Sequence, residues 1–253
     1  MTLLVAMVDP PREGLVLSTL VDTSPVTPAE AVDLYRAMVM DLLRAGVESG
    51  GDVLVNYRPD DLLPESHRRA RTSESAVREL AAEALDADEL ADVRFEVQVG
   101  SSHEARVGNA VTHLLEREGE SSVAVAAPTA PLLGRTTLDS AAMKLRRRDV
   151  VLGPAAEGRV YYAGFDAPVD FAGAYAVPEL ETLTARALDA GLDVDFLPES
   201  VALRTGTDLC TLLARVDARR RAGRIVPRHT AATLAGLPIH VTEHDGERVL
   251  HRD

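Results

Sequence analysis

Short apolar runs alternate along this chain with longer segments in which apolar side chains recur every three or four residues. The runs have the length and β-branched content of buried strands, and the segments between them place apolar residues on one helix face. Strands and helices that alternate in this way form a mostly parallel sheet covered by helices on both faces. The expected strands are residues 3–8, 53–57, 95–99, 123–127, 150–152, 160–162 and 194–197. The sequence therefore predicts a three-layer α/β/α fold.

Four segments have the residues that cap the start of a helix. Each places Ser or Thr three residues before Glu or Asp, the spacing of a capping box, and the first adds a proline at the opening helical position. The segments are 27–30, 101–104, 136–139 and 205–208. Because capping explains these polar residues, we do not assign them to catalysis.

The length of 253 residues fits one main domain with a small addition. We expect the main α/β domain over residues 1–222, which the family resemblance described below implies to be a nucleotide-binding domain. Residues 223–253 form a C-terminal extension, with a short helix near 230–235 and a hairpin of 239–243 with 248–250 around Asp245-Gly246.

The excess of acidic over basic residues limits the classes of function that the protein can have. Asp and Glu total 40 against 27 Lys and Arg, the net charge is −13, and Lys144 is the single lysine. An acidic surface of this kind is typical of halophilic proteins and argues against a nucleic-acid partner, which requires basic surface. No apolar run approaches the roughly 20 residues of a membrane span. The single Cys210 and the lack of a basic leader indicate a cytoplasmic protein without a membrane partner.

Residues 149–165 contain the most distinctive motif. A strand runs into Gly153-Pro154, an acidic corner follows at Glu157-Gly158, and a second strand includes Tyr161. This segment resembles the late signature of the glycosyltransferase-A-like (GT-A) nucleotidyl and glycosyl transferases related to 2-phospho-lactate guanylyltransferase. The resemblance covers about residues 3–213. It implies a GT-A fold in which a nucleotide or nucleotide-sugar lies beyond the carboxyl ends of the strands.

The resemblance also implies a set of substrate-binding candidates. They lie in the first loop, on the helix after the third strand, after the fourth strand, in the late signature and before residue 205. The set consists of Arg12, Gly14, Arg106, Asn109, Thr129, Pro154, Gly158, Tyr161 and Arg204. We expect their pocket between residues 11–20, 128–132 and 153–162.

The charged positions of the family pattern are mostly replaced. Leu17 and Thr19 occupy the positions of phosphate-binding cations, Thr129 that of the metal-binding aspartate, and Ala202 and Arg204 those of two later aspartates. Mg²⁺ in phosphoryl-transfer sites is normally held by carboxylates together with phosphate oxygens. The resemblance therefore implies a divergent relative that binds a nucleotide or nucleotide-sugar and in which metal-dependent transfer is lost or weak. We expect no resident metal.

Two alternatives remain open. In an active transferase that uses Mg²⁺ or Mn²⁺, Glu157 would be the catalytic and metal-binding carboxylate, Arg12 and Arg204 would contact phosphate, and Tyr161 would contact the substrate. In a non-enzymatic protein, the same fold would serve structure or partner docking. The base, the sugar, the acceptor and the oligomeric state are not determined by the sequence.

His240, Glu243 and His244 spell the His-x-x-Glu-His string of one class of zinc peptidase. That chemistry requires a helix, on which both histidines share one face. The β-branched neighbours predict a strand instead, where the two histidines lie roughly 13 Å apart. We therefore expect no zinc site here.

Overall fold

Seven strands form one sheet in the computed structural model, which describes residues 2–244 and 246–253. The order across the sheet is β3-β2-β1-β4-β6-β5-β7, and β6 runs antiparallel to both of its neighbours. The strands are β1 (Thr2–Val8), β2 (Val53–Tyr57), β3 (Arg94–Val97), β4 (Ser122–Ala126), β5 (Val150–Ala155), β6 (Arg159–Phe165) and β7 (Val194–Phe196). This arrangement confirms the predicted mostly parallel α/β sheet.

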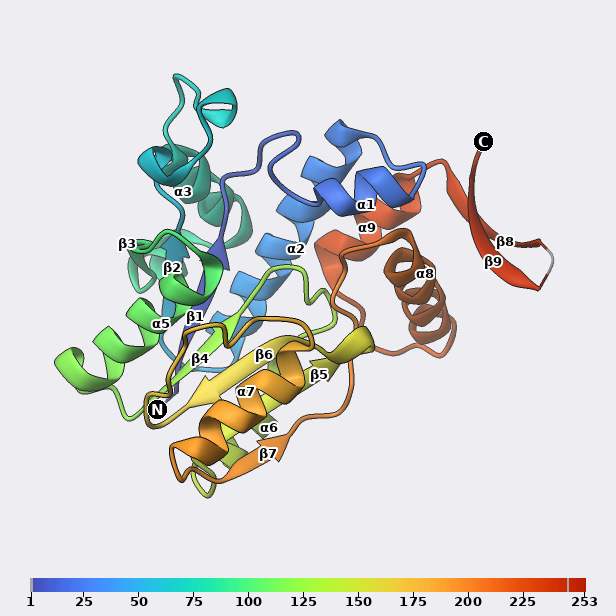
Figure 1. Ribbon diagram of the computed structural model, residues 1–253. Coiled ribbons are helices and arrows are strands. Elements are labelled where there is room, and N and C mark those ends of the chain that lie inside the picture. The colour runs from blue at the N-terminus through green and yellow to red at the C-terminus, as the bar shows by residue number, and fades with distance from the viewer. Residues whose placement is uncertain (1, 245) are drawn as a thin grey trace.

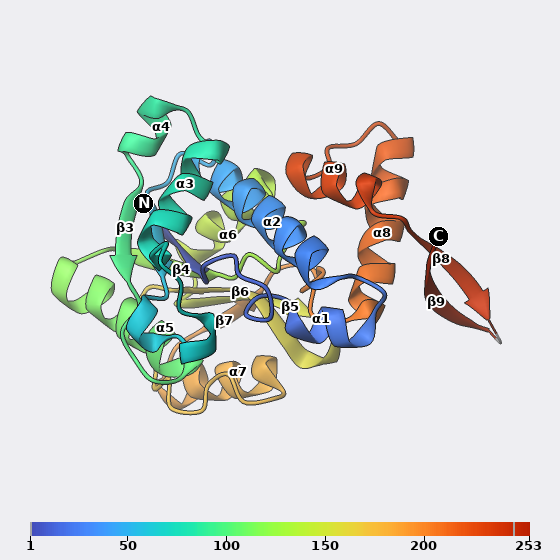
Figure 2. The ribbon, with the colours of Figure 1, turned by 90° about the horizontal axis from the view of Figure 1, so that it is seen from above.

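Helices cover both faces of this sheet, so the molecule has three layers (Figures 1 and 2). One face carries α1 (Ser18–Thr23), α2 (Pro28–Glu48), α3 (Ser73–Ala84), α4 (Ala87–Ala91) and α6 (Arg135–Leu145), with α8 (Gly206–Arg221) and α9 (Arg228–Gly236) at its edge. The opposite face carries α5 (His103–His113), which Leu114–Glu118 continues as a π-helical turn, and α7 (Glu179–Asp189). None of the helices in the described part of the chain is long and apolar enough to cross a membrane.

Strand β1 shows why the strands could be recognised in the sequence. Leu4, Ala6 and Val8 point into the core under α2, whereas Leu3 and Val5 point into the core under α5 and α7. Because successive side chains of a strand face opposite ways, a strand covered on both faces must be apolar throughout. This uninterrupted apolar run is the pattern from which the sequence predicts the strand.

Two of the four predicted capping boxes are confirmed. Thr27 caps α2 and Thr205 caps α8, and in each the acidic residue three positions later accepts a hydrogen bond from the backbone N–H of the capping residue. The other two predictions were wrong. Ser102 rather than Ser101 caps α5, and α6 begins after Gly134 without a side-chain cap, so Thr136 lies within its first turn.

The C-terminal segment contains the predicted helix and hairpin, with strands β8 (Ile239–His244) and β9 (Glu247–Arg252). Asp41 of α2 accepts hydrogen bonds from the backbone N–H groups of His229 (2.9 Å) and Thr230 (2.7 Å) at the start of α9. The predicted turn residue Asp245 lies outside the described residues. Residues 240–244 lie in strand β8, so the zinc-peptidase-like string has the expected strand conformation.

A salt bridge also attaches the hairpin to α2. Arg252 donates to both carboxylate oxygens of Glu30, at 2.8 and 2.9 Å. These hydrogen bonds lower the pKa of Glu30 to about 2, with the backbone N–H of Thr27 acting in the same direction. The hairpin and the capped start of α2 therefore share one carboxylate.

A buried ion pair joins β6 to the start of α8. The guanidinium of Arg159 donates to both oxygens of Asp208, at 2.6 and 2.9 Å, and also to the carbonyls of Ala156 and Ala202. Burial alone would raise the pKa of Asp208, but hydrogen bonds from Arg159 and from the backbone ahead of α8 lower it. The pair thus fixes the segment that leads into α8 against the sheet.

The variant Arg159→Met tests this pair. We expect the free energy of unfolding to fall by about 3–5 kcal/mol, because removing one partner of a buried pair leaves the other charge uncompensated. Chemical denaturation in concentrated salt would measure the loss. The control is Arg148→Met, which breaks an exposed pair with Asp193 and should cost about 0–1 kcal/mol. Equal losses in the two variants would contradict the assigned role of Arg159.

Candidate functional site at the strand ends

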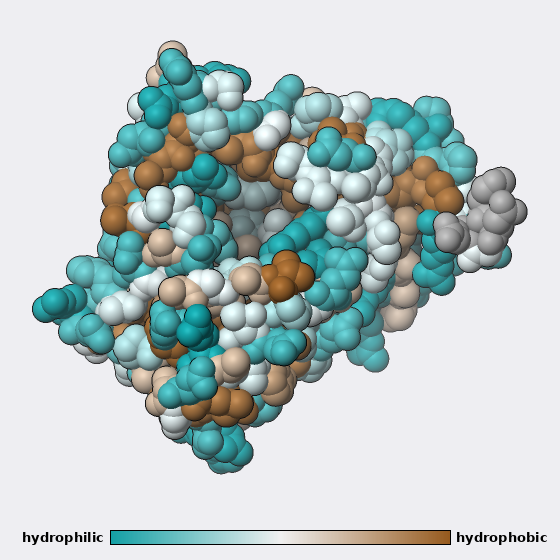
Figure 3. Space-filling view, in the orientation of Figure 1, coloured by the Kyte–Doolittle hydropathy of each residue, from teal (hydrophilic) through white to brown (hydrophobic). Residues whose placement is uncertain are grey.

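A cavity of about 400 Å³ lies beyond the carboxyl ends of β1 and β4. We call it the strand-end pocket. In the space-filling view the face toward the viewer is hollowed near the end of β1 (Figure 3).

Strand order reverses between β1 and β4, since β2 and β3 lie on one side of β1 and β4 on the other. Ligands of open α/β sheets bind at such switch points. The lining residues are Met7, Asp9, Tyr35, Gln98, His103, Glu104, Arg106, Ala127, Pro128, Thr129, Tyr175, Glu179 and Arg204.

Arg106, on α5, has a buried donor in this pocket. Its Nε has no hydrogen-bond partner among the residues that the structure describes. Burial, and then the nearby positive charge of Arg58, lower the pKa of its guanidinium, while Asp9 and Glu104 oppose that effect. A buried N–H without an acceptor costs about 1–3 kcal/mol. The fold thus leaves one buried N–H of the Arg106 guanidinium without an acceptor.

Arg204 supplies a second cation and is held in place by Glu179. Its guanidinium lies 2.9 Å from Oε1 of Glu179, and 44% of its side chain remains exposed. The Glu179 side chain is itself buried, and its Oε2 accepts a hydrogen bond from the backbone N–H of Val160 (2.9 Å). Both oxygens of Glu179 are therefore engaged, and Arg204 lines the pocket with part of its side chain exposed.

Asp9 follows directly after β1. Burial raises the pKa of its carboxyl group, and the guanidinium groups of Arg58, 3.5 Å away, and Arg106 oppose this rise. The backbone N–H of Asp9 donates to the hydroxyl of Tyr35 (2.8 Å). The carboxyl group of Asp9 therefore lies close to the positive charges of Arg58 and Arg106.

His103 contributes a neutral ring to the pocket. Its ring meets that of Tyr175 edge to face, with centroids 4.9 Å apart. The surrounding protein and the neighbouring Arg106 lower the pKa of His103 to about 4, although part of the side chain remains open to the pocket. At neutral pH the imidazole can donate one hydrogen bond and accept another.

The side chains of the strand-end pocket are poorly suited to bind a divalent metal ion. No group of three or more His, Cys, Asp or Glu side chains is placed to hold a metal ion within residues 2–244 and 246–253. Of the three pocket carboxylates, Glu179 is fully engaged, Asp9 faces Arg58 and Arg106, and Glu104 is hydrogen-bonded to Ser102 and to its own backbone N–H. A divalent metal ion such as Mg²⁺ is normally bound by one or two available carboxylates.

Three of the residues predicted from the sequence line the pocket: Arg106, Thr129 and Arg204. Arg12 does not line it. The guanidinium of Arg12 is buried and donates to the carbonyl of His67 (2.6 Å), to Asp60 Oδ1 (3.0 Å) and to the carbonyl of Arg71 (2.9 Å). These contacts tie the first loop to the segment 60–71.

The other predicted residues also lie outside the pocket lining. Asn109 donates to the carbonyl of Val99 (2.7 Å), and the buried Tyr161 donates to the carbonyl of Pro198 (3.0 Å). Gly14 and Gly158 both have positive φ, close to His67 and Pro178 respectively. Pro154 lies at the register shift between β5 and β6.

Glu157, the candidate catalytic carboxylate, lies in the turn between β5 and β6. Its side chain is 72% exposed, and its nearest basic group is Arg159 at 3.7 Å. The pocket also differs from the one expected from the sequence. Residues 128 and 129 line it, but the walls expected from 11–20 and 153–162 are replaced by α5, by the segment from Tyr175 to Glu179 and by Arg204. The reason is that β6 and β5 lie farther along the sheet than β4.

Sequence reasoning missed Asp9, His103, Glu104, Tyr175 and Glu179 as lining residues. Asp9 comes directly after β1, and His103 opens the helix that follows β3. Polar residues at the carboxyl ends of strands are a signal that could have indicated both. Glu179 had no such signal.

Comparisons with known proteins agree with this architecture. Residues 67–173 match a family described as an uncharacterized protein conserved in bacteria (DUF2064). A candidate nucleotide-diphospho-sugar transferase from Desulfovibrio desulfuricans G20 is 22% identical, with a TM-score of 0.68 over 89% of this chain and 100% of that chain. None of the curated proteins matches.

Two further solved structures align over most of this chain. The first is 4-diphosphocytidyl-2C-methyl-D-erythritol synthase from Anaerococcus prevotii DSM 20548, at 11% identity and a TM-score of 0.48, covering 85% of this chain and 99% of that chain. The second is CMP:2-keto-3-deoxy-manno-octonic acid synthetase complexed with CTP, at 12% identity and a TM-score of 0.48, covering 87% and 100%. The Desulfovibrio structure shows that this chain shares the α/β fold of that candidate nucleotide-diphospho-sugar transferase.

The titration of His103 tests the described pocket. We expect its imidazole to remain neutral from pH 8 to pH 5 and to gain a proton only near pH 4, because the surrounding protein and the positive charge of Arg106 disfavour the cation. NMR spectra of the ring nitrogens would follow the transition, with His103→Gln identifying the signal. A midpoint near the ordinary histidine value of about 6.5 would contradict this environment.

Proposed function

We propose that the protein binds a nucleotide or nucleotide-sugar in the strand-end pocket, and that arginines there hold its phosphates without a divalent metal. The observation that carries this proposal is the buried, unpartnered Nε of Arg106 in a pocket that Arg204 also lines. Guanidinium groups match phosphate oxygens in geometry and charge, and such hydrogen bonds are roughly twice as strong as neutral ones.

The position and size of the pocket support the same conclusion. The cavity of about 400 Å³ is within the range of about 300–1,000 Å³ for small-molecule sites. It lies at the switch point of a sheet whose fold is that of a nucleotide-diphospho-sugar transferase. A phosphate at Arg106 would satisfy the one buried donor that the fold leaves unpaired there.

The charge arrangement supports binding without metal. Arg204 stands where the GT-A resemblance expects an acidic residue, and its ion pair with Glu179 fixes it beside the pocket. A fixed guanidinium can supply positive charge that a metal ion otherwise provides. We infer that metal-dependent transfer in this protein is lost or weak.

Calorimetric titration with CTP, GTP and UDP-glucose tests the proposal, in concentrated salt with either EDTA or Mg²⁺. At least one ligand should bind with EDTA present. Arg106→Gln should weaken that binding about 10- to 100-fold, because a charge-assisted hydrogen bond contributes about 1.5–3 kcal/mol. The matched control is Arg117→Gln, an exposed arginine just beyond α5, which should bind as the unmodified protein does.

Two other results would overturn the proposal. Metal-stimulated turnover that Glu157→Gln abolishes would identify an active transferase with a different site. Absence of binding for all three ligands under both conditions would favour a structural or partner-docking protein.

A further inference from the structure

Gln98 is a buried polar side chain of the strand-end pocket that has no part in the nucleotide-binding proposal above. It follows β3 directly and lines the pocket, although only 5% of it is exposed. A buried amide costs free energy unless its polar atoms form hydrogen bonds, and most buried side-chain polar atoms have such partners. The partners of its nitrogen and its oxygen therefore indicate whether one of them is left for a ligand.

Hydrogen bonds fix the orientation of the Gln98 amide. Its Nε2 donates to the backbone carbonyl of Asn56 (2.8 Å), and its backbone N–H donates to the carbonyl of Tyr57 (2.8 Å). An amide nitrogen can donate to a carbonyl and an amide oxygen cannot, so the side-chain atom that faces Asn56 is the nitrogen. The oxygen, Oε1, therefore points away from the Asn56 carbonyl.

This oxygen has no donor within the protein. No N–H or O–H group of residues 2–244 and 246–253 donates to Oε1 of Gln98. Asn56 lies beside the pocket residue Met7 in the sheet and is 3% exposed. Its Oδ1 is likewise buried without a partner in the described part of the chain. Two neighbouring amide oxygens therefore lack donors, and one of them belongs to a residue that lines the pocket.

The pocket lining thus lacks both an acceptor and a donor. Arg106 Nε requires an acceptor, and Gln98 Oε1 requires a donor. An ionised phosphate group has acceptor oxygens only, so it can bind Arg106 but cannot donate to Gln98. The donor for Gln98 must therefore come from a part of the ligand other than its phosphates.

We propose that Gln98 determines the specificity of the strand-end pocket, because its Oε1 accepts a hydrogen bond from an N–H or O–H group on the uncharged part of the ligand. This inference rests on the proposed function, since it takes a nucleotide or nucleotide-sugar as the ligand. Two groups of such a ligand have a suitable donor, the exocyclic amino group of a base and the hydroxyl group of a sugar. An analogue without that donor leaves the buried oxygen unpaired and binds more weakly.

Calorimetric titration of the full-length protein, in concentrated salt with EDTA, tests this inference with matched ligand pairs. CTP with UTP, and CDP-glucose with UDP-glucose, exchange an amino group for a carbonyl oxygen, and GTP with ITP removes an amino group. Deoxy forms of the ligand that binds most tightly remove one sugar hydroxyl at a time. In at least one pair, the ligand that has the donor should bind about tenfold more tightly or better. The pair that differs identifies the donor as amino or hydroxyl.

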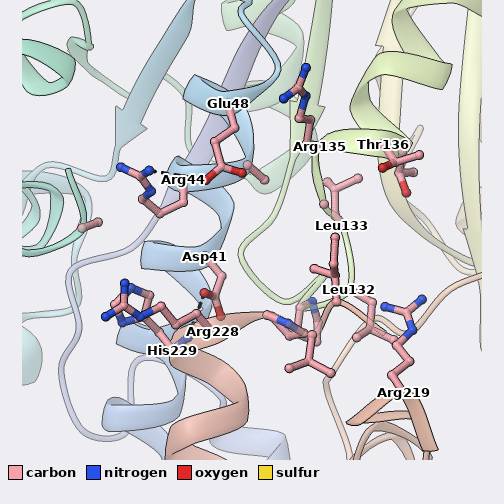
Figure 4. A pocket seen from close by; sticks show the side chains of 18 of the residues that line it. Asp41, Arg44, Glu48, Leu132, Leu133, Arg135, Thr136, Arg219, Arg228 and His229 are labelled. Atoms are coloured by element: carbon pink, nitrogen blue, oxygen red, sulfur yellow. Dashed lines mark hydrogen bonds and ion pairs between the residues drawn. The ribbon is translucent and has the colours of Figure 1, made fainter. Parts of the chain in front are cut away.

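The variant Gln98→Met keeps a side chain of similar length and removes the amide oxygen. It should bring the affinity ratio of that pair close to one, and circular dichroism would confirm that it is folded. Arg106→Gln should weaken both members of the pair by a similar factor and leave their ratio unchanged, because both have the same phosphates. The matched control is Arg219→Gln, in a separate cavity of about 980 Å³ beside α2 and α9 (Figure 4). It should change neither the affinities nor their ratio.

The outcomes distinguish this inference from the proposed function. If ligands bind and Arg106→Gln weakens them, but no pair differs, the role of Gln98 is wrong and the proposed function stands. The same conclusion follows if the preference persists in Gln98→Met. The comparison of ligand pairs on the unmodified protein is decisive even if that variant does not fold. Absence of binding for every ligand overturns both proposals.

Discussion

The buried ion pair between Arg159 and Asp208 fixes the segment before α8 against strand β6. Arg159 opens β6, and Asp208 lies in the first turn of α8, 49 residues later. Neither charge could be buried without the other, since an isolated buried ion costs several kcal/mol after relaxation. Asp208 also accepts the backbone N–H groups of Arg204 and Thr205. The segment that bears Arg204 is therefore fixed by the same carboxylate that compensates Arg159.

This constraint extends into the strand-end pocket through Glu179. The backbone N–H of Val160, the residue after Arg159, donates to Glu179, and Glu179 in turn holds the guanidinium of Arg204. Two ion pairs, one buried and one at the pocket rim, thus fix Arg204 from the backbone side and from the side-chain side. Pre-organised donors of this kind lose little conformational freedom when a ligand binds.

The fold could be predicted from the sequence because its signals are local. The continuous apolar run of β1 and the Thr27–Glu30 capping box are each formed by a few consecutive residues. The site could be predicted only in part. Arg12 forms its hydrogen bonds with carbonyls about 55 residues away, and no local pattern distinguishes such an arginine from one that binds phosphate.

The loop between β4 and α6 forms one wall of the strand-end pocket. The carbonyl of Thr129 accepts a hydrogen bond from the backbone N–H of Leu203 (2.7 Å), and the backbone N–H groups of Ala130 and Leu133 close two successive tight turns. A ligand that contacts this wall therefore meets backbone that is already bonded to the segment before α8.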